Sequence, residues 1–171
     1  MSSGAARGPL VGARFDLIDH DGRRVTNATY HGKFPLIFFG FTHCKVVCPR
    51  ALTRLTAVLD GLGERAELLE PLYITVDPER DTPGRMKQFL AANFPRFTGL
   101  TGSEVELSAA REEFRVFARR QRDPEGIEEY VVPHSAITYL LDRSGVFLTH
   151  FTDVIETPEL VRRLDAVLAD A

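Results

Sequence analysis

Short apolar runs alternate with longer helical repeats along this chain, and together they define the elements that the sequence predicts. Residues 34–39 form an apolar run rich in aromatic side chains, and residues 68–76 form a second, so both predict buried strands. Leucines at helical spacing over 51–59 follow the first run. They predict a helix that ends near Gly61 and Gly63, because glycine commonly terminates helices.

The N-terminal part of the chain predicts a β-hairpin. Residues 14–19 alternate between apolar and polar positions, an Asp-Gly step at 21–22 is a hairpin turn signal, and 25–30 can return as the second strand. We expect a flexible N-terminal segment at 1–12 and a single folded domain at 13–171.

Helix caps mark the middle of the chain. Thr82 and Pro83 predict the N-cap and first residue of a helix that stops before Pro95. A short strand is expected at 97–100, and a capping box at 103–106 opens a third helix. The apolar positions of this third helix are Leu107, Phe114 and Phe117.

The C-terminal part predicts another hairpin and a last helix. Residues 119–129 are charged and contain Pro and Gly, so they predict an exposed loop or hairpin. Strands are expected at 135–141 and 146–151, with a turn at 142–145 between them. Residues 157–159 are expected to cap a helix whose apolar face carries Leu160, Leu164 and Leu168.

The order of these elements predicts an α/β fold with a mixed central sheet flanked by helices on both faces. Parallel crossovers come early, a tight hairpin comes late, and a cysteine-containing stretch follows the first core strand. This order is typical of a thioredoxin-like fold, here with an added N-terminal β-hairpin.

Composition excludes several classes of protein. With 171 residues, 44% hydrophobic and 26% charged, the chain is expected to be one soluble globular domain. A net charge of −3 does not suggest nucleic acid or an acidic membrane as partner. No apolar run is long enough to span a bilayer, and residues 1–9 lack the apolar core of a signal peptide.

Both cysteines, Cys44 and Cys48, lie where the first core strand gives way to a helix that begins near Pro49. A helix N-terminus favours negative charge, and Lys45 adds a nearby cation, so we expect at least one thiol to ionise easily. The spacing puts the sulfurs about one helical turn apart on one face. They could form a disulfide after a small backbone adjustment or hold one soft metal ion. Two inert buried cysteines are the weaker interpretation.

Four motifs in order then resemble the Sco/SenC family: Gly40 to Pro49, Thr75 to Pro83, Phe97 to Gly102, and His134 to Asp142. The resemblance implies a thioredoxin-like domain, usually anchored in a membrane and facing the periplasm or the mitochondrial intermembrane space. It implies one bound copper ion and a role in assembling the binuclear copper site of cytochrome c oxidase, as a metal donor, a thiol reductant or both.

The residues that this resemblance assigns to copper are Cys44, Cys48 and His134, the two cysteines also being the redox-active pair. Thiolates suit Cu(I), and an imidazole helps to accommodate Cu(II). The implied partner is the copper-bearing subunit of cytochrome c oxidase or another copper chaperone, and the implied location is periplasmic. We expect a monomer.

Two departures from the family pattern lie beside these residues. Lys45-Val46 replaces a common Pro-Asp pair, and Pro133 replaces an Asp that often precedes the ligand histidine. Both remove an acidic group, which should favour the thiolates but weaken copper binding. Pro133 is also a candidate for a cis peptide bond.

Other functions and other residues stay open. A thiol–disulfide oxidoreductase would use Cys44 to attack and Cys48 to resolve, and a redox or copper sensor would only dock to a partner. Zinc fits less well, because a structural zinc site needs a fourth protein ligand.

His43 is a possible further ligand. Residues 77–81 form either a supporting network or a self-contained turn, and structural or solvated roles are expected for the remaining histidines, His20, His31 and His150.

Overall fold

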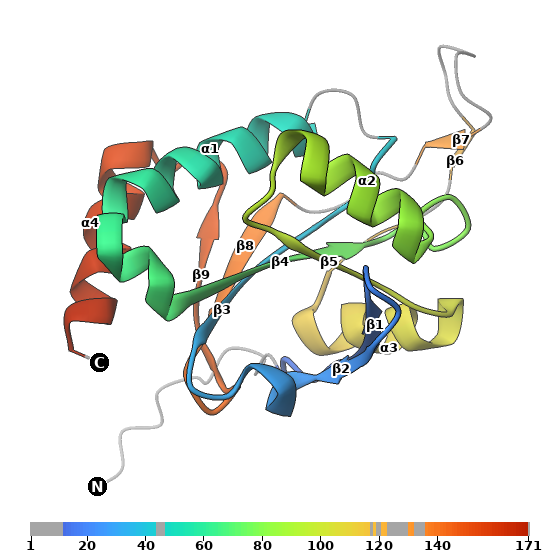
Figure 1. The fold of residues 1–171 in the computed structure, drawn as a ribbon, viewed down its shortest axis with the longest axis horizontal. Helices are drawn as coiled ribbons and strands as arrows, with labels where there is room; N and C mark the ends of the chain where they lie inside the picture. Colours follow the sequence, from blue (N-terminus) through green and yellow to red (C-terminus); the bar gives the residue numbers. More distant parts are fainter. Residues whose placement is uncertain are drawn as a thin grey trace, which may run out of the picture.

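A seven-stranded sheet forms the centre of the computed structural model, which describes residues 12–43, 47–116, 118, 121–122, 130–131 and 136–170 (Figure 1). The strand order is β2-β1-β5-β4-β3-β8-β9. The strands of this sheet are β1 (Asp16–Asp19), β2 (Arg24–Thr26), β3 (Phe34–Gly40), β4 (Leu69–Thr75), β5 (Thr98–Thr101), β8 (Ile137–Leu141) and β9 (Phe147–Thr152).

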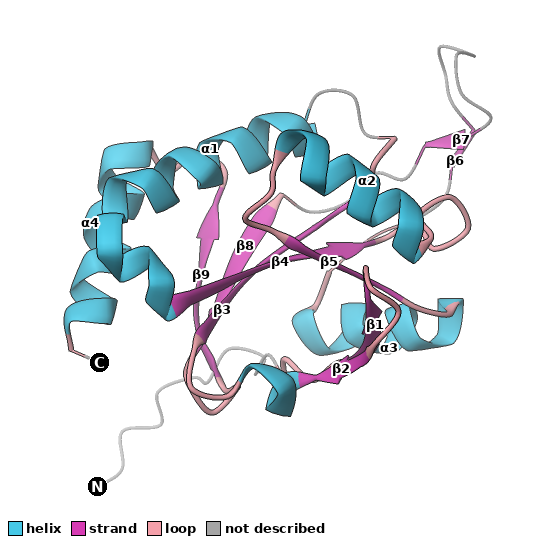
Figure 2. Ribbon diagram, in the orientation of Figure 1, coloured by secondary structure: helices cyan, strands magenta, loops and turns pink. Residues whose placement is uncertain are grey.

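Helices cover both faces of the sheet, as Figure 2 shows by their colour. The α-helices are α1 (Val47–Leu62), α2 (Pro83–Asn93), α3 (Glu104–Phe114) and α4 (Thr157–Ala169). Two 3-10 helices, η1 (Asn27–Tyr30) and η2 (Gly63–Leu68), follow β2 and α1. The predicted mixed sheet with flanking helices and an N-terminal hairpin is confirmed.

The middle of the sheet is parallel, and this sets where a site can form. β3 pairs in parallel with β4, and β4 pairs in parallel with β5. The carboxyl ends of these three strands, at Gly40, Thr75 and Thr101, therefore meet at one edge of the sheet. Open α/β sheets commonly bind ligands at this kind of edge.

The alternation of side chains along β3 divides the core into two halves. One face of this strand, including Leu36 and Phe38, packs into a cluster with residues of α1, α2 and α4. The other face, including Ile37 and Phe39, packs with the hairpin and α3. Because β3 is buried on both faces, its sequence is a continuous apolar run rather than an alternating one.

Close contact between α2 and β5 depends on a glycine. A Cβ atom added at Gly99 would lie 3.0 Å from Met86 Cβ and 3.0 Å from Leu90 Cδ1. Met86 and Leu90 are both buried, so the helix lies directly against the strand. Any side chain at Gly99 would push α2 away from the sheet.

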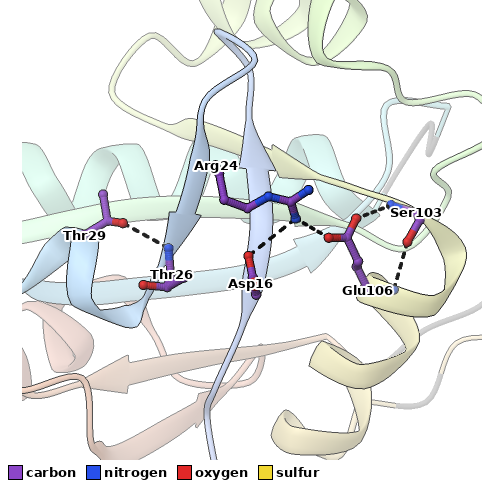
Figure 3. A network of polar contacts seen from close by, with 6 residues as sticks. All are labelled: Asp16, Arg24, Thr26, Thr29, Ser103 and Glu106. Atoms are coloured by element: carbon purple, nitrogen blue, oxygen red, sulfur yellow. Dashed lines mark hydrogen bonds and ion pairs between the residues drawn. The ribbon is translucent and has the colours of Figure 1, made fainter.

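Polar contacts attach the N-terminal hairpin to α3 (Figure 3). The Arg24 guanidinium donates to the carboxylates of Asp16 and Glu106. Glu106 also accepts from the backbone N–H of Ser103, whose hydroxyl accepts from the Glu106 N–H, so the predicted capping box is present. One carboxylate thus caps α3 and anchors the hairpin.

Two local predictions need correction. The returning strand of the hairpin is only Arg24–Thr26, because Asn27 turns inward and donates its side-chain amide to the carbonyl oxygens of Ala13 and Gly145. Residues 27–30 therefore form η1 instead of extending the strand. Thr157 is the first residue of α4 rather than its cap, which is Glu156 without a side-chain cap hydrogen bond.

The third helix and the charged segment were placed correctly in outline. α3 ends at Phe114, where Arg115 adopts a left-handed conformation with φ of 56°, and Phe117 lies outside the described residues. Short strands β6 (Gln121–Arg122) and β7 (Tyr130–Val131) pair in antiparallel fashion, so the hairpin form of the loop-or-hairpin prediction is confirmed. Among the helices of the described residues, none combines the length and the apolar character needed to cross a membrane.

Candidate functional site

The described ends of the cysteine stretch (residues 40–49) lie where the parallel strand β3 ends and α1 begins. β3 ends at Gly40 and α1 begins at Val47, so the predicted strand-to-helix junction is confirmed by its two ends. Cys48 and Pro49 belong to the first turn of α1. Cys44 lies outside the described residues.

The register of β8 brings a second segment to the same edge. β8 runs antiparallel to β3, with Leu36 opposite Leu140 and Phe38 opposite Thr138. The end of β3 therefore lies level with the start of β8 at Ile137. His134 and Pro133 precede this start and lie outside the described residues, so the cis peptide prediction at Pro133 is untested.

A buried hydrogen-bond network holds Thr42, which follows β3 and precedes the two cysteines. The Asp81 carboxylate accepts from the backbone N–H of Thr42 at 3.0 Å and from its hydroxyl. The Thr75 hydroxyl donates to the same carboxylate at 2.7 Å. The Thr101 hydroxyl donates to the Asp81 backbone carbonyl at 2.8 Å. Residues at or just beyond the ends of β3, β4 and β5 thus converge on one aspartate.

Burial governs the ionisation of Asp81. Desolvation raises the pKa of this fully buried carboxyl above its usual value of 3.8, and the hydrogen bonds from Thr42 and Thr75 partly oppose the rise. Asp81 also immediately precedes Thr82, the N-cap of α2, where a helix dipole favours negative charge.

The turn between β4 and α2 contains a second buried carboxylate. Asp77 is 2% exposed and forms an ion pair with Arg80. Its carbonyl oxygen accepts from the Asp81 N–H, which closes the turn, and the Arg80 guanidinium lies 5.8 Å from the centre of the Phe41 ring. The closed turn is therefore present, and Asp81 also bonds to Thr42. A supporting or docking role of residues 77–81 at a metal site stays a prediction.

The remaining histidines have the structural or solvated environments that were expected. His20 accepts a hydrogen bond at Nδ1 from the Gly99 N–H at 3.1 Å. His31 and His150 are exposed, and His43 is half-buried just before Cys44. Over the described residues, no three His, Cys, Asp or Glu side chains are grouped to hold a metal ion.

Sequence reasoning missed the roles of Thr42, Thr75 and Thr101. The available signal was that a hydroxyl residue lies at or just beyond the end of each of three strands expected in the sheet. Such residues become meaningful only when the strand order brings their ends together.

An open mixed sheet, with a cysteine at the junction between its central strand and the next helix, defines a thioredoxin-like protein. The SCO1/SenC family model matches residues 3–169. The chain therefore belongs to the SCO1/SenC family, and the family predicted from the sequence motifs is confirmed.

Similar proteins agree with this assignment. A SCO2-like protein from Rickettsia felis is 37% identical over 141 residues, which cover 82% of this chain and 69% of the relative. The human mitochondrial SCO1 homologue is 39% identical over 145 residues, covering 84% of this chain. The match spans 48% of the human protein, so the chain corresponds to about half of that relative's length.

Solved structures resemble the whole fold. The copper-bound crystal structure of Arabidopsis thaliana ScoI gives a TM-score of 0.87 at 31% identity, covering 94% of this chain and 99% of that one. BsSco, described as a member of the Sco family of cytochrome c oxidase assembly proteins with a disulfide switch, gives 0.69 at 27% identity. Its match covers 94% of this chain and 92% of that one. The predicted class, a family of copper-binding proteins of cytochrome c oxidase assembly, is confirmed.

Proposed function

We propose that this chain binds one copper ion through Cys44, Cys48 and His134 and helps to supply the binuclear copper site of cytochrome c oxidase. The register of β8 against β3 carries the proposal, because it brings the segment that follows His134 level with the segment that leads to Cys44. The copper-bound Arabidopsis relative, which resembles nearly the whole chain, supports it.

The chemistry of the three side chains fits copper. Two thiolates are soft ligands that hold Cu(I), and a neutral imidazole completes a set that can also accept Cu(II). Cys48 lies in the first turn of α1, where unpaired backbone N–H groups favour the thiolate over the thiol. The residues of this chain would hold the ion as cargo and release it to a partner with a better ligand set.

The partner and compartment follow from the same assignment. We propose the copper-bearing subunit of cytochrome c oxidase, or another copper chaperone, as the docking partner of a monomer. The human relative is named as mitochondrial, and the chain would act on the face of a membrane where the oxidase copper site is assembled, such as the periplasmic face.

A copper titration of His134→Ala tests the ligand set. Wild-type reduced protein should retain one copper ion per chain after desalting and should show thiolate-to-copper visible absorption with Cu(II). His134→Ala should lose this absorption and keep part of its Cu(I), because Cu(I) persists with two sulfur ligands whereas Cu(II) needs a fuller set. His150→Ala is the matched control, since His150 is exposed on β9 and should behave as wild type.

Two outcomes would reject parts of this proposal. If His134→Ala binds Cu(I) and Cu(II) as tightly as wild type does, His134 is not a ligand. Wild-type protein that retains no copper but reduces a disulfide substrate would favour the thiol–disulfide oxidoreductase, which the disulfide switch described for BsSco also suggests. In that reaction the Cys44 thiolate attacks the substrate disulfide and releases one substrate thiol. Cys48 then attacks the Cys44 sulfur of the mixed disulfide and releases the second thiol, which leaves Cys44 and Cys48 joined as a disulfide.

A further inference from the structure

Asp81 is buried completely, yet both of its carboxylate oxygens accept hydrogen bonds. Oδ1 accepts from the Thr42 hydroxyl, and Oδ2 accepts from the Thr42 N–H and the Thr75 hydroxyl. The side chain has no exposed surface, so these bonds replace the water that a carboxylate normally binds.

Thr42 is the link from this carboxylate to the cysteine stretch. It is 9% exposed and lies two positions before Cys44 in the sequence. Its backbone N–H and its hydroxyl both donate to Asp81, which restrains the backbone and the side chain at once. The Thr42 hydroxyl oxygen also accepts from Arg85 Nε of α2 at 2.9 Å, so the link extends to a helix.

The other partners make Asp81 a rigid anchor. Its backbone N–H donates to the Asp77 carbonyl at 2.9 Å, and its own carbonyl accepts from Thr101 at the end of β5. Thr75, which donates to the carboxylate, is the last residue of β4 and is itself fully buried. The chain leaving β3 is therefore tied through Asp81 to the ends of β4 and β5, to β4 by the carboxylate and to β5 by the backbone carbonyl.

We propose that Asp81, acting through Thr42, is a positioning residue that holds the start of the cysteine stretch in the arrangement that copper binding requires. The inference rests on the proposed function for its copper readout, and it adds a residue that does not touch the ion. Groups that orient metal ligands in this indirect way commonly change affinity when they are replaced.

A carboxylate suits this role better than a neutral group of the same shape. A carboxamide accepts through only one oxygen. In Asp81→Asn the amide nitrogen must therefore face either the Thr42 N–H, which is a donor, or the Thr42 hydroxyl, which already accepts from Arg85. The first orientation breaks the bond from the Thr42 N–H. The second removes the acceptor of the Thr42 hydroxyl and leaves its oxygen to accept from both Arg85 and the amide, and in either case the volume hardly changes.

The experiment measures copper affinity by competition, the thiolate-to-copper absorption and the rate of thiol alkylation in the reduced full chain. We expect Asp81→Asn to weaken copper binding about 10- to 100-fold and to shift the absorption while far-UV circular dichroism stays unchanged. Thr42→Val should move the same readouts in the same direction, because it removes the hydroxyl and keeps the shape. Thr42→Ser should restore wild-type values, because it keeps the hydroxyl.

Two further variants separate positioning from general stability. Asp19→Asn alters a buried carboxylate that accepts from the N–H groups of Asp21 and Arg23 in the hairpin turn, and it should leave all three readouts at wild-type values. The double variant Asp81→Asn/Thr42→Val should weaken binding by less than the product of the two single effects, because both break the same link.

Several results would overturn the inference. Folded Asp81→Asn and Thr42→Val proteins with wild-type copper affinity and alkylation rates would reduce Asp81 to a structural residue. If Asp81→Asn does not fold, the comparison of Thr42→Val with Thr42→Ser decides, and equal behaviour of these two rejects the role. If wild-type protein binds no copper, the proposed function fails, and the alkylation rates alone then confirm or reject the positioning role.

Discussion

Asp77 and Asp81 show how two neighbouring buried carboxylates acquire different tasks from their partners. Asp77 forms an ion pair with Arg80 within its own turn. Asp81 instead receives backbone and hydroxyl donors from Thr42, 39 positions earlier, and a hydroxyl donor from Thr75 at the end of β4. The ion pair of the first carboxylate lies within its own turn, and the second carboxylate joins the ends of separate strands.

The thiols provide a prediction at the same scale. Cys48 lies in the first turn of α1 and Lys45 lies between the two cysteines, so at least one thiol should ionise below the free-cysteine pKa of about 8.5. Alkylation rates against pH, measured separately in Cys44→Ser and Cys48→Ser, give the pKa of each remaining thiol. Lys45→Gln should raise the lower of the two values, because it removes the nearby cation.

The activation argument fails if both remaining thiols titrate at or above the free-cysteine value. A normal pKa in both variants would also remove the reason for expecting fast thiol–disulfide exchange, since the thiolate is the attacking species.

At the scale of elements, capping residues decide where helices begin. Thr82 accepts a hydrogen bond from the Arg85 N–H and opens α2, and Ser103 opens α3 with a full capping box, both as predicted. Thr157 was wrong as a cap because the preceding Glu156 already has the extended conformation that a cap requires. Local residue preferences thus located each helix, and the precise first residue depended on the entering backbone.

Glu70 on strand β4 gives a prediction of how the stability of the protein depends on pH. Glu70 is half-buried, and desolvation raises its pKa above 4.5, while Lys33 Nζ at 4.0 Å partly lowers it. A carboxyl with a raised pKa in the folded state binds a proton more tightly there, so the free energy of unfolding falls as pH rises through the window above 4.5. Glu70→Gln should remove this loss and raise stability at pH 7 relative to wild type.

Chemical unfolding at a series of pH values measures this effect. The advantage of Glu70→Gln should be present at pH 7 and should shrink as the pH falls, until it is lost below 4.5, where Glu70 becomes protonated in both the folded and the unfolded state. Glu67→Gln in η2 is the control, because Glu67 is exposed. An advantage that stays constant with pH would show that the effect comes from packing rather than from ionisation.

For the whole molecule, copper should act as a stabilising ligand. A ligand that binds only the folded chain stabilises it by about 2.7 kcal/mol when its free concentration is 100 times its Kd. For a domain of this size that corresponds to a rise in Tm of about 5–10 °C. Differential scanning calorimetry of reduced protein with and without Cu(I) measures the rise.

Two comparisons check that this stabilisation comes from the proposed ligands. Removal of the ion with a chelator should return Tm to the metal-free value. Cys44→Ser/Cys48→Ser should show no rise, because both soft ligands are gone. An equal rise in the double variant would place the copper elsewhere on the molecule.

Most of the architecture could be predicted from the sequence because its signals are local. The buried strand β3 is a continuous apolar run, and β4 is buried except at the half-buried Glu70. The amphipathic helices α1 and α4 carry their leucines at helical spacing. η1 was missed because Asn27 bonds to Gly145, which is 118 positions away. No local pattern contains such a contact.

The candidate site was less predictable for the same reason. The family motifs suggested Cys44, Cys48 and His134 together, but nothing in the spacing of the chain placed Thr42 against Asp81, 39 positions later. Their contact exists only because β3 and β4 are neighbours in the sheet and end at the same level. The ligand set itself stays a prediction, since Cys44 and His134 lie outside the described residues.

The attachment of the N-terminal hairpin has a consequence for the order in which a growing chain can fold. The hairpin closes on itself early, but β1 takes its place in the sheet beside β5, and Arg24 reaches its α3 partner Glu106 across 82 positions. During synthesis the hairpin must therefore wait, with one strand edge unpaired, until β5 and α3 have emerged. Contacts between such distant segments form slowly, because a long loop must close first. The hairpin leaves the ribosome before β5 and α3, yet it reaches its final place in the sheet only after both of them are available.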